Sequence, residues 1–146
     1  MIPPGGGRGI TGFRKGIKHY CRSTLEVNFA RVLIHEAVPY EYEPKVFMLP
    51  EGARWTPDFH LLAPLGDLIP AGWVELKGWQ HADGTLPGTA GDKIVAFEKL
   101  TGLKVSVVVQ DSDLWRKIET VYSHLLLWER PGRNLKTHPD VFGRAT

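Results

Sequence analysis

The fold of this chain is decided by the stretch Trp73-Val74-Glu75-Leu76-Lys77-Gly78, which has the length and alternation of a β-strand. Successive side chains of a strand point to opposite faces, so Glu75 and Lys77 are expected on one face and Val74 and Leu76 on the other.

A second strand is predicted at Asp58 to Leu62, with Pro57 at its start, where a missing N–H is tolerated. Pairing of the two strands as a hairpin would bring Asp58, Glu75 and Lys77 together. Two neighbouring carboxylates repel each other unless a cation lies between them. An all-oxygen set favours a hard divalent ion, Mg²⁺ or Mn²⁺, and Lys77 would position a water molecule or stabilise developing charge on a phosphate. His60 shares the face of Asp58, and a structural role is favoured for it.

The rest of the chain alternates helical and extended patterns. Helices are predicted from Ser23 or Thr24 to about Ala37, from Asp92 to Thr101 and from Ser112 to about Trp128. Further strands are predicted within Tyr40 to Leu49, interrupted at Pro44, and at Val105 to Val109, whose apolar run is typical of a strand buried on both faces. The order predicts an α/β protein with a mixed β-sheet flanked by helices.

Helical spacing also predicts which side chains face the core. The inward set of the second helix is Ile94, Phe97 and Leu100, and that of the third is Leu114, Ile118, Val121, Leu125 and Trp128. Residues 78–91 are rich in Gly and Pro and are interpreted as a mobile loop without regular structure.

Composition restricts the class of protein. The chain has 146 residues, 42% of them hydrophobic and 23% charged, which fits a single globular domain spanning residues 1–146. No apolar stretch is long enough to span a bilayer, and the first residues lack the apolar core of a signal peptide, so an intracellular, cytoplasmic protein without a membrane partner is expected. The single Cys21 excludes an intramolecular disulfide and a zinc site built from several thiolates.

Basic residues gather at both ends of the chain. Residues 1–22 carry five bases and no acid, and residues 130–146 also have a basic excess. We interpret residues 1–20 as a flexible basic arm and residues 130–146 as a basic tail. Such segments pair with phosphates, although charge that only keeps the termini solvated is an equal alternative. The candidate phosphate-binding residues here are Arg14, Lys15, Lys18, Arg22, Arg130, Arg133 and Lys136.

Glu26 has two interpretations. It lies within the apolar arc of the first helix, where a carboxylate without a partner would be costly. It is also the last residue of Ser23-Thr24-Leu25-Glu26, a capping box in which Glu26 would accept a hydrogen bond from the backbone N–H of Ser23. Catalysis and capping are therefore both open for Glu26.

Taken together, Glu26, Pro57-Asp58 and Glu75-Leu76-Lys77 resemble the PD-(D/E)xK nuclease superfamily, whose core is restriction-endonuclease-like. Within it, the segments around these residues resemble the phage endonuclease I type of Holliday junction resolvase and related small phage endonucleases. The resemblance covers about residues 20–110, and includes Tyr42-Glu43-Pro44.

The resemblance implies a magnesium-dependent endonuclease, with Mn²⁺ as a substitute ion. Asp58, Glu75 and the backbone carbonyl of Leu76 would bind one or two metal ions, Lys77 would be the catalytic lysine, and Glu26 would complete the site, directly or through water. Lys93 is placed like a basic residue that many relatives direct at the phosphate.

Function is then expected to be hydrolysis of DNA, selective for branched DNA such as Holliday junctions in DNA recombination. A homodimer is expected because two strands need two sites, and a phage-encoded protein acting in a bacterial host fits the resemblance. One alternative is a site-specific nicking or homing endonuclease on duplex DNA. Alternatives of other classes are a non-catalytic DNA-binding protein on a nuclease fold and a glycosidase using Asp58 and Glu75 as acid and base.

Overall fold

The computed structural model describes residues 14–129, and these form two compact units. The first unit comprises residues 14–37 and 117–129, and the second comprises residues 38–116. Within the described range, no helix combines the length and the apolar character that a membrane span requires. The prediction of one nuclease domain for the whole chain stays a prediction.

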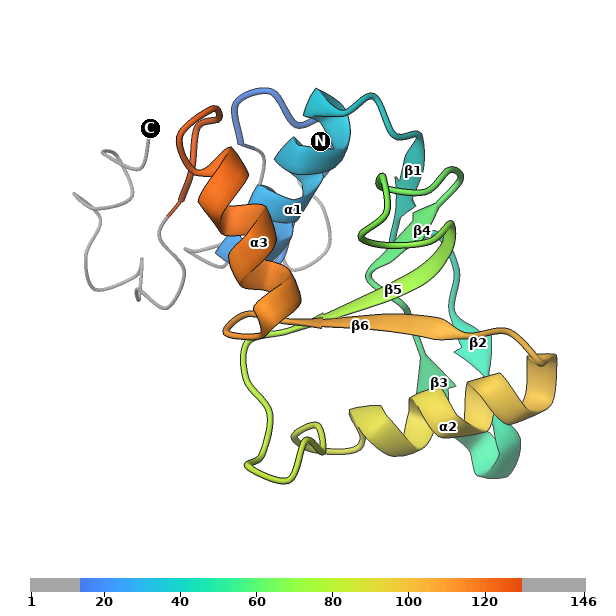
Figure 1. Cartoon of the computed structure of the whole chain (residues 1–146). Coiled ribbons are helices and arrows are strands. Elements are labelled where there is room, and N and C mark those ends of the chain that lie inside the picture. The colour runs from blue at the N-terminus through green and yellow to red at the C-terminus, as the bar shows by residue number, and fades with distance from the viewer. Residues whose placement is uncertain (1–13, 130–146) are drawn as a thin grey trace. The chain divides into compact units, whose positions relative to one another are not determined.

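The second unit is built on a mixed four-stranded sheet in the order β1-β4-β5-β6 (Figure 1). The strands are β1 (Tyr40–Tyr42), β4 (Phe59–Leu61), β5 (Gly72–Lys77) and β6 (Val105–Val109). β4 pairs antiparallel with both β1 and β5, whereas β5 and β6 are parallel. The predicted hairpin of the two central strands and the mixed α/β class are confirmed.

A small two-stranded sheet lies beside helix α2 (Ala90–Thr101) in this unit (Figure 1). It consists of β2 (Phe47–Met48) and β3 (Arg54–Trp55), which are joined by the short helix η1 (Pro50–Gly52). Trp55 and Phe97 are almost fully buried, with ring centroids 4.8 Å apart. Trp73, Val105 and Val107 pack against the same core, so α2 covers the face of the main sheet on which these side chains lie.

Two predictions of inward-facing residues in this unit are wrong. Leu100 of α2 is 61% exposed, because Ile94 and Phe97 already fill the contact with the core and Gly102 ends the helix in a left-handed conformation (φ 74°). β6 is buried only at Val108 and Val109, while Val105 to Val107 are half-buried. It is an edge strand, because β5 is its only neighbour in the described sheet.

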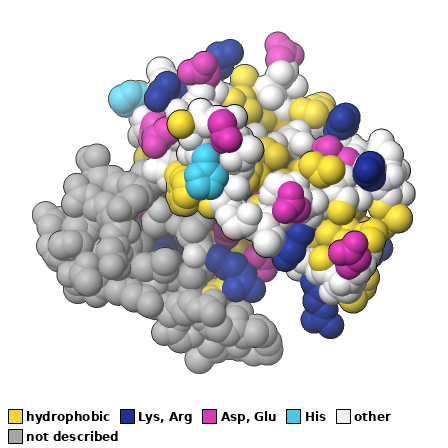
Figure 2. Space-filling model, turned by 90° about the horizontal axis from the view of Figure 1, so that it is seen from below, with side chains coloured by type: hydrophobic (Ala, Val, Ile, Leu, Met, Phe, Trp, Pro, Cys, Tyr) yellow, Lys and Arg dark blue, Asp and Glu magenta, His cyan; other side chains and the backbone are white. Residues whose placement is uncertain are grey.

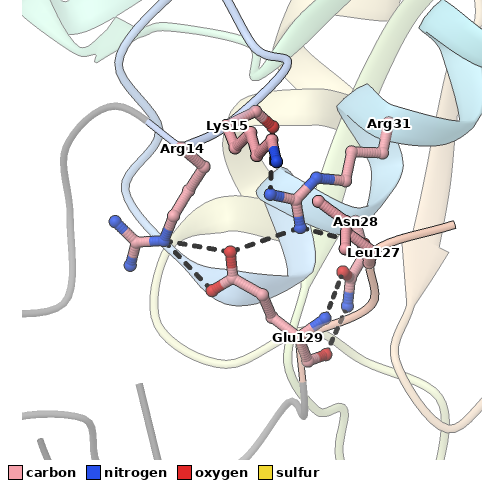
Figure 3. Close-up of polar contacts among 6 residues, drawn as sticks. All are labelled: Arg14, Lys15, Asn28, Arg31, Leu127 and Glu129. Carbon is pink, nitrogen blue, oxygen red and sulfur yellow. Dashed lines mark hydrogen bonds and ion pairs between the residues drawn. The ribbon is translucent and has the colours of Figure 1, made fainter. Parts of the chain in front are cut away.

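The first unit is organised around helix α1 (Thr24–His35), whose N-cap is Ser23, as predicted. Glu129 binds this helix through a buried network (Figure 3). Its backbone exchanges two hydrogen bonds with the Asn28 side chain, and its carboxylate pairs with Arg14 and Arg31. Burial lowers the pKa of Arg31, and the Glu129 carboxylate opposes that effect.

Helix α3 (Asp113–Tyr122) begins after Ser112, whose hydroxyl accepts a hydrogen bond from the Trp115 N–H, as predicted for a cap. The prediction that the helix reaches Trp128 is wrong. Arg31 binds the carbonyl of Leu127, and Asn28 binds the backbone of Glu129, so these residues bond to α1 rather than continue α3.

The inward set predicted for α3 also needs correction. Val121 is 52% exposed and Leu125 is 61% exposed, while Trp115, Ile118 and Tyr122 form the buried stripe. The Tyr122 hydroxyl donates to the Glu36 carboxylate at the end of α1. Burial, followed by this carboxylate, raises the pKa of Tyr122 to about 12.

Candidate active site on the central hairpin

Asp58 lies directly before β4 and faces the edge of β5. Its Oδ2 accepts a hydrogen bond of 2.7 Å from the backbone N–H of Leu76. This bond continues the antiparallel ladder past the last backbone pair, Phe59 with Val74. Asp58 is therefore fixed in position by the same strand that carries Glu75 and Lys77.

The register places the three predicted catalytic residues on one face of the hairpin. His60 lies opposite Trp73, and alternation along both strands puts Asp58, Glu75 and Lys77 on that face. The Lys77 ammonium is 3.5 Å from Glu75 Oε2, and the exposed fractions of the two side chains are 27% and 8%. Charge attraction at this separation offsets part of the cost of burying Glu75.

The backbone of Leu76 supplies a further oxygen on the same side. In an extended strand the N–H and C=O of one residue point to the same edge, so the Leu76 carbonyl faces the edge where its N–H meets Asp58. Lys77, the next residue, points its carbonyl the other way, where it accepts from Gln110. Two carboxylates and a carbonyl fit the ligand preference of Mg²⁺ and Mn²⁺.

Glu43 is a residue that the sequence reasoning did not select. It offers a carboxylate oxygen within 4.8 Å of one from Asp58, and its backbone N–H donates to the Asp58 carbonyl at 2.8 Å. Glu43 has φ 43°, an uncommon conformation for a residue other than Gly, Asn or Asp. The sequence feature that could have pointed to Glu43 is the segment Tyr42-Glu43-Pro44, which is part of the resemblance.

His60 has structural partners in this unit. Its ring stacks on Trp73 with centroids 3.9 Å apart, and its Nδ1 lies 3.1 Å from Glu41 on the neighbouring strand. Both contacts hold the imidazole at the sheet surface. This arrangement agrees with the structural role favoured from the sequence.

Glu26 belongs to the first unit, and its contacts there are those of a helix cap. Ser23 Oγ accepts from the Glu26 N–H at 3.2 Å, and Glu26 Oε1 accepts from the backbone N–H of Arg22 at 2.8 Å. The hydrogen bond predicted from the Ser23 N–H to the Glu26 carboxylate is thus replaced by one from the N–H of Arg22. Burial of the neighbouring Cys21 thiol raises its pKa, and the charge of Glu26 raises it further.

The predicted phosphate-binding residues differ in their surroundings. Lys15, Lys18 and Arg22 are exposed, and Lys93 is half-buried in the first turn of α2. The side chain of Arg14 is only 9% exposed and is held by Glu129 (Figure 3). On the face shown in Figure 2, basic side chains are interspersed with acidic ones. Three of the predicted residues lie outside the described range: Arg130, Arg133 and Lys136.

Comparisons with protein-family models, with curated proteins and with solved structures each return no match.

Proposed function

We propose that this protein is a metal-dependent endonuclease that hydrolyses phosphodiester bonds in DNA. The observation that supports this proposal is the shared face of Asp58, Glu75 and Lys77 at the end of the β4–β5 hairpin, with Asp58 Oδ2 2.7 Å from the Leu76 N–H and Lys77 Nζ 3.5 Å from Glu75. Two neighbouring carboxylates repel each other unless a cation lies between them, which favours a metal ion at this strand end.

In this proposal Asp58, Glu75 and the Leu76 carbonyl hold Mg²⁺ or Mn²⁺. A divalent ion bound there supplies a Lewis acid for the phosphate and lowers the pKa of a bound water. Lys77 donates hydrogen bonds to the attacking water or to a non-bridging phosphate oxygen, where negative charge grows in the transition state. Asp58 also keeps Leu76 in register, so the ligands are held before substrate binds.

Branched DNA is the proposed substrate, as in Holliday junction resolution, and a homodimer would give the two sites that symmetric cutting needs. The exposed Lys15, Lys18 and Arg22 would contact phosphates. These proposals, together with a phage origin, rest on the resemblance and on charge.

A second candidate, a non-catalytic DNA-binding protein, is favoured by one observation. Asp58 and Glu75 both have partners that a purely structural role would explain, the Leu76 N–H and the Lys77 ammonium. This candidate predicts DNA binding that needs no metal and leaves the strands intact.

One substrate panel separates the candidates. The full chain is incubated with four-way junction, linear duplex and single-stranded DNA of the same sequence, with Mg²⁺ or with EDTA. The endonuclease proposal expects metal-dependent cleavage, at least about tenfold faster on the junction. Binding without cleavage of any substrate in Mg²⁺ or Mn²⁺ would support the second candidate and contradict the first.

A further inference from the structure

A cavity of about 540 Å³ lies within the second unit, where it is lined by the loop of residues 81–88, helix α2 and strand β6. Its size falls in the range of about 300–1,000 Å³ that is common for small-molecule sites. The cavity adjoins the candidate active site, because its lining residue Val107 is the register partner of Glu75 on the parallel strands β5 and β6. Register partners on neighbouring strands point their side chains to the same face, and paired strands are about 4.8 Å apart, so Glu75 and Val107 are neighbours on one face of the sheet.

The lining of the cavity combines an apolar floor with a polar rim. Leu86, Ile94 and Val107 supply apolar surface, and Thr85 and Asp92 supply oxygen atoms. The Asp92 carboxylate would repel a phosphate but would accept hydrogen bonds from an amino group. A flat ring with amino donors on its edge therefore suits this cavity better than an anion does.

An exposed aromatic side chain stands beside the cavity. Trp79 is 55% exposed, although tryptophan side chains are on average largely buried. Its ring meets the His81 ring edge-to-face, with centroids 4.9 Å apart, and His81 lines the cavity. Trp79 follows Lys77 by two residues, so its backbone lies within about 7 Å of that of the proposed catalytic lysine.

The loop that carries His81 is held in a defined turn. The His81 N–H donates to the Thr85 carbonyl and the Gly84 N–H donates to the His81 carbonyl, both at 2.8 Å. Asp83 Oδ1 accepts from the Thr85 N–H and hydroxyl, and these hydrogen bonds lower the pKa of Asp83. Residues 78–89 contain no helix or strand, as predicted, but they have this internal structure. The prediction that the irregular segment extends to Gly91 is wrong, because α2 begins at Ala90.

We infer that this cavity, with Trp79 at its side, receives an unpaired nucleobase that bears an exocyclic amino group. The inference deepens the proposed nuclease function and rests on it for the identity of the ligand as DNA. A base beside a branch point lacks a continuous stack and leaves its pair at a lower cost than a base within regular duplex, so the cavity would select the substrate. Base–aromatic stacking supplies affinity, and Asp92 and Thr85 supply the polar contacts.

Gly91 offers a clean way to test this inference. It lines the cavity in the first turn of α2, a Cβ there meets nothing within 4 Å, and its φ is not in the left-handed range. Gly91→Leu would therefore fill the cavity without backbone strain. Gly91→Ala is the matched control, since it gives a similar gain in helix propensity and leaves most of the volume open.

The experiment measures binding of the full chain, in EDTA, to two DNA hairpins that differ at one bulged position, which is either an unpaired adenine or an abasic residue. Wild type and Gly91→Ala should bind the adenine hairpin about tenfold more tightly than the abasic hairpin. Trp79→Ala and Gly91→Leu should lose this preference and keep the affinity for the abasic hairpin, while Trp79→Phe should retain most of it. Thermal melting of each variant verifies the fold.

Equal binding of both hairpins by wild type, absence of binding to either, or full preference in Gly91→Leu would overturn the inference. Cleavage of the same hairpins in Mg²⁺ is scored separately. A preference for adenine without any cleavage would refute the nuclease proposal and support the cavity. Cleavage without a preference would refute the cavity alone.

Discussion

At the scale of single residues, the candidate site combines the buried carboxylate of Glu75 with the more exposed ammonium of Lys77. Glu75 is covered by protein, whereas more than a quarter of the Lys77 side chain remains accessible. A ligand of a metal ion gains from exclusion of water, because its charge interacts more strongly there. A group that contacts the substrate has to stay reachable, as Lys77 does.

Lys77→Met should lower the rate of cleavage by about 10²-fold or more while leaving the apparent Mg²⁺ affinity within a few-fold of wild type. The reason is that Lys77 acts on the phosphate or the water and is not an oxygen ligand. Single-turnover rates across a Mg²⁺ titration measure both quantities. Lys104→Met, at an exposed lysine in the same unit, serves as the control. Full recovery of the rate at high Mg²⁺ would show that Lys77 only supports the metal site.

Sequence alone could predict that Asp58, Glu75 and Lys77 share a face, because side-chain alternation is a local rule and β4 and β5 are consecutive strands. Glu43 could not be found in this way. It follows β1 with a positive φ, and its approach to Asp58 depends on how β1 pairs with β4, a pairing that no local pattern specifies.

At the scale of elements, the N-terminus of α1 lies where the sequence predicts it, but one of its capping hydrogen bonds differs from the prediction. Ser23 caps the helix, and Glu26 reaches back to the N–H of Arg22. Helix ends follow from capping residues near in sequence, which is why this boundary could be predicted. The end of α3 could not, because Leu127 and Glu129 are bound by α1 residues about 100 positions away.

Glu26→Gln should separate capping from catalysis. Gln keeps an acceptor for the Arg22 N–H, so the melting temperature should stay within about 1 °C of wild type, measured by circular dichroism. If the nuclease proposal extends to Glu26, cleavage at limiting Mg²⁺ should fall at least about tenfold, because the negative charge is lost.

Ser23→Ala is the complementary variant. It removes the other half of the cap at a cost of about 1 kcal/mol and leaves the Glu26 carboxylate in place. A fully active Glu26→Gln protein beside a destabilised Ser23→Ala protein would assign Glu26 to the cap alone.

At the scale of the whole molecule, Glu129 joins distant parts of the chain within the first unit. Its carboxylate pairs with Arg14 and Arg31, and its backbone binds Asn28 (Figure 3). The sequence suggested that Arg14 belongs to a basic arm for DNA. Its partner, Glu129, is 115 residues away in the sequence. A pairing over that separation cannot be predicted from the local charge pattern.

Glu129→Gln should destabilise the protein by about 3 kcal/mol, because it leaves two poorly exposed guanidinium groups without their counter-charge. The backbone bonds to Asn28 would remain, so the fold should persist with a lower denaturation midpoint. Urea unfolding followed by tryptophan fluorescence measures the change. Glu119→Gln in α3 is the control and should shift the midpoint little. A loss below about 0.5 kcal/mol would show that the network contributes no net stability.

The nuclease site is tested most directly by cleavage of a four-way DNA junction with wild type, Asp58→Asn and Glu75→Gln in Mg²⁺ and in EDTA. We expect wild type to cleave only with the metal. Both variants should lose at least about 10²-fold in rate and still bind the junction, because each removes one ligand charge at nearly constant shape. Cleavage at a near wild-type rate by either variant, or undiminished wild-type cleavage in EDTA, would contradict the proposed site.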